Sequence, residues 1–508
     1  AQMMQNPHDE REPRALPTAE ELRGKKAGGQ KNAGGGRKKR GIVLLCLAAA
    51  LCLAAGGMRL AQWLRPAQET PAATVAQTPQ PAVELVNRPK DSVQSISIQR
   101  RGEESYTLAC QASPSEEADT AGEVAYSLAG NDAFTVDQAM GERAMAYCTQ
   151  WYAASLVEEN VADLERFGLK EPALRVTVHG ADGSAETWLF GDKAPTEAAY
   201  YLAKEGGNTV YLVYASAYNV FNHAVREWHS LELPVSFASG SDIRSATIAQ
   251  SGEETVQLRV REEGEEGISL SNIVLVQPFA YDAHSERAME VLEGIAAFSV
   301  EAYAGQLGEL VDTGLETPAA SFAAEGLDGK ELCVRVGNYQ GETSRYVQID
   351  DTDAVYLASA ASLSFLSQAT TANLVDQFSN IMFIDYVDAI HIRASGAQYE
   401  LAIRRDGETT EYLLDGNPMQ EDAFKSLYQQ IIGVMVSQIS DDRNLQGEVV
   451  ASVSYELNRA PYSLEIEYLA YDDAYYAVRR EGITPFLVRH AAVDSLLDGL
   501  AAAVAQEH

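Results

Sequence analysis

Apolar and polar residues alternate in the same way in three stretches of the chain, 93–108, 243–258 and 387–401. In each stretch, two short alternating runs flank a glycine. The apolar positions of the first stretch are Val93, Ile96, Ile98, Tyr106 and Leu108, with Gly102 between the runs. Neighbouring side chains of a strand point to opposite faces, and glycine tolerates the backbone of a tight turn. Each stretch therefore predicts a β-hairpin with one buried face.

A helix is predicted after each hairpin. The tetrapeptide Glu-Arg-Ala-Met occurs at 142–145 and again at 286–289, and the third helix is expected from Glu421 to Val436. In this third segment apolar residues recur at helical spacing, at Phe424, Leu427, Tyr428 and Ile431. Such a stripe indicates a helix that packs against a sheet.

Further landmarks repeat after the helices. A Gly-Leu-x-x-Pro turn stands at 168–172 and 314–318, where glycine can leave a helix with positive φ and proline prevents its resumption. A strand that ends in Gly191 recurs 146 residues later, ending in Gly337. The last hairpin of the first copy recurs in the third copy at an offset of 275, so that Tyr200-Tyr201 matches Tyr475-Tyr476. The third copy lacks the Gly-Leu-x-x-Pro turn and is the most degenerate.

These landmarks predict an α+β protein built from three tandem, diverged units, each an antiparallel sheet with a helix. Runs of strands around few helices favour this class over a parallel α/β sheet. The predicted units are 91–240, 241–385 and 386–505, each long enough to bury its own core.

The chain before these units has a different pattern. Residues 41–58 contain no charge and span roughly 27 Å as a helix, which is enough to cross a bilayer core. With interfacial residues added, the predicted transmembrane helix is 41–64. The preceding residues 1–40 read as a disordered tail that carries ten basic and five acidic residues. The positive-inside rule then places the N-terminus in the cytoplasm and the rest of the chain outside.

A spacer and two alternatives complete this region. Five prolines predict a semi-extended linker over 65–90: Pro66, Pro71, Pro79, Pro81 and Pro89. A cleaved signal peptide is the competing interpretation, but about 40 residues before the apolar core are long for one. A lipoprotein signal is disfavoured because Leu51 precedes Cys52, where a small residue is expected.

The charge excludes one class of partner. The formal net charge is −34 at pH 7, and residues 66–508 hold 68 acidic against 27 basic residues. A field of this sign repels polyanions, so no nucleic-acid partner is expected.

Candidate chemistry is sparse. The sequence has no HExxH, GxSxG, GxGxxG or GxxxxGK[ST] motif and no CxxC pair, so we predict no catalytic, cofactor-binding or metal-binding residues and no enzymatic activity. A bridge between Cys110 and Cys148 stays open, with small buried thiols as the simpler interpretation. His223 and His229 are interpreted as surface or interface residues rather than metal ligands. The run 350–353 is assigned to a hairpin turn in preference to a calcium loop.

Two tyrosines are the candidate surface for a ligand or partner, Tyr201 and Tyr476. Each belongs to a Tyr-Tyr pair on a predicted strand, so one tyrosine of each pair is expected in the core and the other on the surface. Exposed aromatic rings can stack on glycans or peptides. An ordinary amphipathic strand residue is the alternative.

The same landmarks resemble a bacterial family catalogued as domain of unknown function 4340. They are the Ile96 and Ile98 strand, the Gly168 to Pro172 turn, the strand that ends in Gly191 and the Tyr200-Tyr201 hairpin. The likeness is best over 90–230 and weaker beyond. It implies an N-terminal anchor and no established activity, and it implies an association with ABC-transporter components of the kind named after gliding motility.

We therefore expect a non-enzymatic, single-pass membrane protein whose extracytoplasmic units serve as an accessory or scaffold in the bacterial envelope, in contact with ABC transporter subunits. The alternative is a surface module that binds envelope glycan or peptide, and an envelope hydrolase is the third interpretation. No cofactor is expected.

Overall fold

The computed structural model of the chain describes residues 83–112, 124–195, 198–262, 265, 271–394, 396–407 and 409–507. The predicted tail 1–40, the predicted transmembrane helix 41–64 and the first part of the linker lie outside the described residues. None of the helices described in these ranges combines the length and the apolar character that a membrane crossing needs.

Antiparallel sheets with few helices make up the described residues, in agreement with the α+β class. The strands of the first sheet are β2 (Val93–Arg100), β3 (Tyr106–Ala112), β4 (Val124–Leu128), β6 (Ser155–Glu158), β7 (Leu174–Gly180), β8 (Ala185–Lys193), β9 (Ala199–Lys204) and β10 (Val210–Tyr214). Their spatial order is β4-β3-β2-β7-β8-β9-β10-β6. Its helices are α2 (Gln138–Thr149), α3 (Ala215–Phe221) and the 3-10 turns η1 (Lys90–Ser92), η2 (Glu165–Phe167) and η3 (Val225–Trp228).

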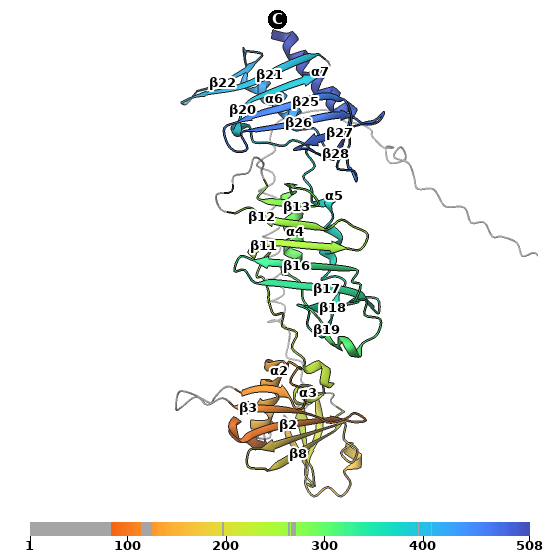
Figure 1. Ribbon diagram of the computed structural model, residues 1–508. Helices are drawn as coiled ribbons and strands as arrows, with labels where there is room; N and C mark the ends of the chain where they lie inside the picture. Colours follow the sequence, from red (N-terminus) through yellow and green to blue (C-terminus); the bar gives the residue numbers. More distant parts are fainter. Residues whose placement is uncertain are drawn as a thin grey trace, which may run out of the picture. The chain divides into compact units, whose positions relative to one another are not determined.

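The second sheet has nine strands. They are β11 (Ile243–Gln250), β12 (Val256–Val260), β13 (Ile273–Gln277), β14 (Tyr281–Asp282), β15 (Ala302–Gln306), β16 (Ala320–Gly326), β17 (Glu331–Gln340), β18 (Ser344–Ile349) and β19 (Ala354–Ser359). Their order is β14-β13-β12-β11-β16-β17-β18-β19-β15, most of which can be followed in Figure 1. The accompanying helices are η4 (Gly240–Asp242), α4 (Ser285–Ala296), η5 (Leu307–Glu309), η6 (Ser364–Gln368) and α5 (Thr371–Leu374).

The third sheet also has nine strands. They are β20 (Val387–Ala394), β21 (Ala397–Asp406), β22 (Thr409–Leu414), β23 (Asn417–Met419), β24 (Gln438–Ile439), β25 (Val449–Leu457), β26 (Ser463–Ala470), β27 (Tyr475–Arg480) and β28 (Ile483–Arg489). Their order is β23-β22-β21-β20-β25-β26-β27-β28-β24. The helices are η7 (Ile384–Tyr386), α6 (Glu421–Ile432) and α7 (His490–Glu507).

The three sheets share one strand order. In each, a three-stranded meander precedes the helix, the first strand of that meander pairs with the first strand of a later four-stranded meander, and a short strand closes the far edge. The second and third sheets add one further short strand, β14 or β23, at the near edge.

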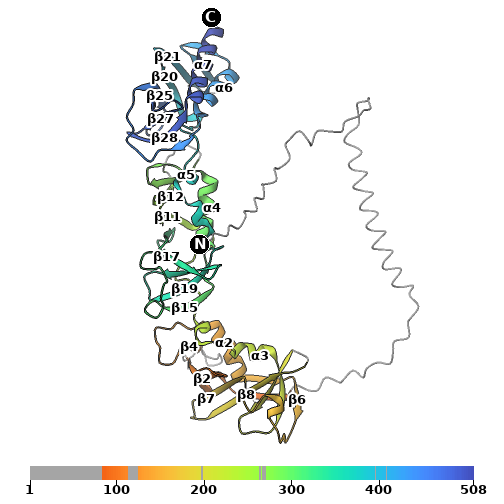
Figure 2. The ribbon, with the colours of Figure 1, turned by 90° about the vertical axis from the view of Figure 1, so that its right-hand side faces the viewer.

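One helix packs on each sheet through the same four positions. The stripe consists of Gly141, Ala144, Met145 and Cys148 in α2, Ala288, Val291, Leu292 and Ile295 in α4, and Phe424, Leu427, Tyr428 and Ile431 in α6, all of them buried. The spacing i, i+3, i+4, i+7 places them along one helical face. In Figure 2, α4 lies on one side of the second sheet, and α6 and α7 lie on one side of the third. The opposite face of each sheet is called the open face below.

The shared stripe corrects one sequence match. Both Glu-Arg-Ala-Met segments lie in the predicted helices, but 142–145 begins at the fifth residue of α2 and 286–289 at the second residue of α4. The identical tetrapeptides are therefore one turn out of register. The positions that correspond are fixed by burial against the sheet rather than by residue identity.

The predicted linker 65–90 extends too far toward the C-terminus. Residues 83–87 form strand β1 (Val83–Asn87), which pairs with β5 (Gln150–Ala153) in a separate two-stranded sheet. Val86 is buried in the first core, where Trp151 is also buried. Three apolar residues in this short run, Val83, Leu85 and Val86, outweigh the flanking prolines because they gain a partner strand and a core to pack against.

Candidate functional site

The open face of the first sheet carries a ladder of hydroxyl groups. The Ser97 Oγ lies 2.8 Å from the Thr107 Oγ1 and 3.0 Å from the His179 Nε2. Thr177 Oγ1 and Thr187 Oγ1 are 2.9 Å apart on the neighbouring strands. These cross-strand pairs satisfy one another, so they stabilise the sheet and make this part of its open face polar.

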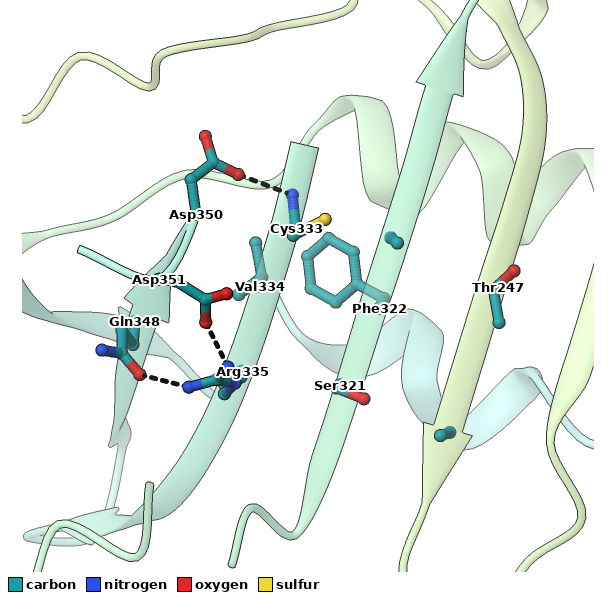
Figure 3. A pocket seen from close by; sticks show the side chains of 11 residues that line it. Thr247, Ser321, Phe322, Cys333, Val334, Arg335, Gln348, Asp350 and Asp351 are labelled. Atoms are coloured by element: carbon teal, nitrogen blue, oxygen red, sulfur yellow. Dashed lines mark hydrogen bonds and ion pairs between the residues drawn. The ribbon is translucent and has the colours of Figure 1, made fainter. Parts of the chain in front are cut away.

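A hollow of about 280 Å³ opens on the second sheet, lined among others by Thr247, Ser321, Cys333, Arg335, Gln348 and Asp351. Figure 3 shows Arg335 between Gln348 and Asp351, with Thr247 and Ser321 on the next two strands. The Arg335 guanidinium donates to Gln348 Oε1 at 3.2 Å and forms an ion pair with Asp351. The hollow thus presents a cation that its neighbours hold in place and partly neutralise.

The open face of the third sheet is charged. His391 Nε2 lies 3.1 Å from Glu456 Oε1, and its Nδ1 lies 4.0 Å from Glu400 Oε2. One strand further along, Arg479 Nε donates to Glu467 Oε2 at 2.6 Å. Among the described residues, no three His, Cys, Asp or Glu side chains are grouped so as to hold a metal ion.

Strand register shows which open-face positions correspond. Each set follows from the pairing of the first strand with the later meander. The corresponding positions are Ser97, Thr247 and His391; Thr187, Cys333 and Glu465; Leu189, Arg335 and Glu467; and Ala203, Gln348 and Arg479. The cross-strand pair at one place is therefore apolar in the first sheet, Arg with Gln in the second, and Glu with Arg in the third.

The run 350–353 forms the turn between β18 and β19, as expected from its sequence. Asp350 and Asp351 take left-handed φ angles of 51° and 54°. The Asp350 carboxylate accepts a hydrogen bond from the Cys333 amide at 2.9 Å. Both side chains thus engage the sheet beside them, which gives each carboxylate a structural partner.

The three cysteines of the described residues are free thiols, Cys110, Cys148 and Cys333. Burial raises the pKa of Cys110 to about 12. Cys333 is exposed, but partial desolvation of its thiol, together with the nearby Glu331 carboxylate, raises its pKa to about 11. Because only the thiolate is a strong nucleophile, the geometry beside Arg335 does not activate Cys333 at neutral pH.

The candidate tyrosines lie in different environments. Tyr201, on β9, is half-buried against Phe167 with ring centroids 4.8 Å apart. Tyr476, on β27, is half-buried and stacks on His490 at 3.9 Å. The two rings belong to different sheets, and no described contact brings them together.

Strand pairing also shows that Tyr201 and Tyr476 do not occupy corresponding positions. Tyr476 pairs with Val488, and in the first sheet it is Tyr200 that pairs with the matching Val213. Tyr200 stacks on Tyr218 of α3 at 4.0 Å, much as Tyr476 stacks on the first residue of α7. Tyr476 therefore corresponds to Tyr200 and faces the helices, and Tyr201 faces the other side. The two tyrosines of each pair do face opposite sides, but all four are half-buried.

The two nearby histidines differ. His229 is buried, and its Nδ1 lies 2.8 Å from the Ser230 carbonyl oxygen. Its ring stacks on Tyr303 at 3.9 Å, and burial lowers its pKa, so it is neutral at pH 7. His223 is partly exposed, with its Nδ1 3.9 Å from Glu227. His229 is thus the interface residue expected from the sequence.

Comparison with known proteins bears on the family. The sequence model of the family described as domain of unknown function (DUF4340) matches residues 127–318. The matched segment begins in β4 of the first sheet and ends at Pro318, the last residue of the second Gly-Leu-x-x-Pro turn. A search of curated proteins and a search of solved structures each found no significant match. Over residues 127–318, the chain is therefore similar to the DUF4340 family.

Proposed function

We propose that this chain is a non-enzymatic accessory protein of the bacterial envelope, which presents the open faces of its sheets to a protein partner. One observation carries the proposal. The three sheets keep the same helix stripe and strand order, but the corresponding open-face positions carry hydroxyls, an Arg-centred hollow and a Glu-Arg-His surface in turn. A constant scaffold with a varied surface is what several distinct contacts require.

The same proposal includes three finer statements. The matching strand orders support triplication of one ancestral unit. The uncharged run 41–58 after a basic tail supports a single-pass anchor with the N-terminus in the cytoplasm. The family resemblance supports ABC transporter subunits as the partner.

Satisfied polar groups favour contact over catalysis. The open-face groups are held by their own neighbours, as in the Arg335 to Asp351 pair and the Arg479 to Glu467 pair. A general base or nucleophile needs an electron pair that no neighbouring group occupies and that lies within reach of the substrate. It also needs a pKa near the working pH. The Cys333 thiol, with a pKa of about 11, does not meet that requirement.

The alternative, binding of envelope glycan or peptide through Tyr201 and Tyr476, would need exposed ring faces. His490 covers one face of Tyr476, and Phe167 packs on Tyr201. The half-buried rings are better suited to fixing the strands than to stacking on a sugar.

Purification of the full-length chain from its own membranes in mild detergent tests the proposal. Transporter membrane subunits should co-purify with the wild-type chain. Thr247→Arg, on the open face of the second sheet, should reduce their recovery several-fold. Glu290→Arg, at an exposed position of α4 on the opposite side, should leave recovery unchanged. A chain that purifies alone, without partners even after crosslinking, would contradict the proposal.

A further inference from the structure

Four basic residues gather around one hollow in the first unit, although the chain is acidic as a whole. The hollow has a volume of about 260 Å³, and its lining includes Arg100, Arg101, Lys170 and Arg175. Arg100 and Arg101 come from the end of β2 and its turn, Lys170 from the Gly-Leu-x-x-Pro turn, and Arg175 from β7. Two turns and the adjoining strand ends thus bring Arg100 and Arg101 together with Lys170 and Arg175, a pair that lies far away in the sequence.

The Arg101 guanidinium is held in place by backbone carbonyl groups. Its Nε donates to the Pro172 carbonyl oxygen at 3.3 Å, and its Nη2 donates to the Glu171 carbonyl oxygen. Among the described residues, no carboxylate forms an ion pair with Arg101. The carbonyl groups orient the guanidinium without cancelling its charge, so this side chain remains able to bind an anion.

The other three cations have partners that an anion can displace. Lys170 pairs with Glu165 at 2.9 Å, and Arg175 pairs with Glu205 at 2.5 Å. The side chains of these two pairs are at least one-third exposed. Arg100, whose side chain is 28% exposed, pairs with Glu103 across a single turn. Exposed ion pairs of this kind contribute little to stability, so exchanging them for a multiply charged ligand costs little.

The second unit shows that the fold does not require these cations. Its β2-equivalent turn has the same backbone, with Ser251 donating to the Ala319 carbonyl as Arg101 donates to the Ala173 carbonyl. The positions of Arg101 and Arg175 are held there by Ser251 and Ser321, and that of Lys170 by Glu316. A basic cluster that is absent from an equivalent turn is not explained by folding.

We propose that this hollow is a binding site for a small phosphate-bearing anion. Guanidinium groups bind phosphate oxygens in a bidentate manner, and four cations match a ligand that carries more than one negative charge. The surrounding acidic surface disfavours a long polyanion but leaves a small one free to enter. The phosphate can belong to a free small molecule or to a lipid headgroup, and the experiment separates these sources.

Titration calorimetry with inorganic pyrophosphate, using the full chain in detergent, tests the site. The wild type should bind, and the affinity should fall as salt is raised. Arg101→Ser with Arg175→Ser, the residues of the second unit, should weaken binding at least tenfold. The matched control is Arg244→Ser with Arg404→Ser, which removes the same charge from exposed positions elsewhere and should bind as the wild type does.

A second arm uses binding of the same three proteins to vesicles that contain phosphatidylglycerol. Loss of vesicle binding in the Arg101 and Arg175 variant, without any pyrophosphate binding by the wild type, would assign the phosphate to a lipid headgroup. Pyrophosphate binding that this variant loses would assign it to a soluble ligand. If the variant and the control behave alike in both arms, the proposal is overturned. Unchanged tryptophan fluorescence of the variant verifies that the first unit is still folded.

Discussion

Gly191 lies against the main chain of Phe167, so that a Cβ atom on Gly191 would come within 3.0 Å of the Phe167 carbonyl oxygen, a separation that Cβ atoms essentially never show. The same relationship recurs in the second unit between Gly337 and Thr313. In both places the strand register shifts just beyond the glycine. The glycine at the end of this strand and the Gly-Leu-x-x-Pro turn are therefore two sides of one close contact.

Gly191→Ala should destabilise the first unit by roughly 1–3 kcal/mol, because the new methyl group meets a backbone oxygen that cannot move aside. Three of the four tryptophans, Trp151, Trp188 and Trp228, lie in this unit, so urea unfolding followed by tryptophan fluorescence reports on it. Gly308→Ala is the control, because a Cβ at Gly308 has no atom within 4 Å. Equal unfolding midpoints for the two variants would refute the packing argument.

The third unit has a different residue at the position that corresponds to Gly191. Tyr468 pairs with Ala451 and Val478 as Phe190 pairs with Leu174 and Leu202. The residue after it is Leu469, which pairs with Val449 and Ala477 without a shift in the ladder toward β27. Relative to this pairing, β25 begins two residues earlier than β7, where the first unit has the end of its Gly-Leu-x-x-Pro turn.

The close approach in the third unit is found at Gly447 instead, where a Cβ would come within 3.0 Å of the Ala470 carbonyl oxygen. Gly447→Ala should therefore loosen the pairing of β25 with β26. Hydrogen exchange of their amides should accelerate at least tenfold, and the amides of β11 and β16 in the second unit provide an internal reference. Unchanged protection of both strand pairs would show that Gly447 is not needed for this contact.

How far the sequence predicts this fold depends on whether a feature is local. The stripe of α6, from Phe424 to Ile431, was predicted residue by residue because helical periodicity is written in one segment. The turn glycines Gly168 and Gly314 have the predicted positive φ angles. Strand β1 was missed because its partner, Trp151 in β5, lies more than sixty residues away.

The candidate surfaces were less predictable for the same reason. Cys333, Arg335 and Asp351 share one hollow because strand pairing places them together, and no spacing along the chain signals it. The repeat alignment equated Tyr201 with Tyr476, but a one-residue difference in strand register exchanges the two faces. The cluster of Arg101 and Arg175 was not predicted, because the net charge of an acidic chain does not show where its basic residues gather in the fold.

Cys333 should react slowly at neutral pH although it is exposed, because partial desolvation of the thiol and the neighbouring Glu331 raise its pKa to about 11. Alkylation by iodoacetamide should be at least a hundredfold slower at pH 8 than for a free cysteine of pKa about 8.5, and should rise about tenfold per pH unit up to pH 10. Mass spectrometry of the peptide that carries Cys333 measures the rate. Glu331→Gln should accelerate it, and a rate that levels off near pH 9 would contradict the assignment.

Glu186 should contribute to the stability of the first unit above about pH 4.5. Burial opposes its ionisation, but hydrogen bonds from Lys204 and Arg88 prevail and lower its pKa. A carboxylate with a lowered pKa in the folded state stabilises the fold above its unfolded pKa, and that contribution is lost as the pH falls through the folded pKa. The wild type should therefore lose more stability than Glu186→Gln between pH 5 and pH 3.

Urea unfolding of both proteins at several pH values, followed by tryptophan fluorescence, measures this difference. Glu158→Gln, which removes a more exposed partner of Arg166, serves as the control and should follow the wild-type profile. Parallel profiles for the wild type and Glu186→Gln would mean that the Arg88 and Lys204 contacts do not favour the ionised form.

Site-specific photo-crosslinking in native membranes tests most directly whether the open faces contact the partner. A photoreactive residue placed at Thr247 or Ser454, on open faces, should yield a crosslinked adduct with a transporter subunit. The same residue at Glu290 in α4 or Asp422 in α6, both exposed on the helix side, should yield none. Adducts from the helix positions alone, or from none of the four, would contradict the account.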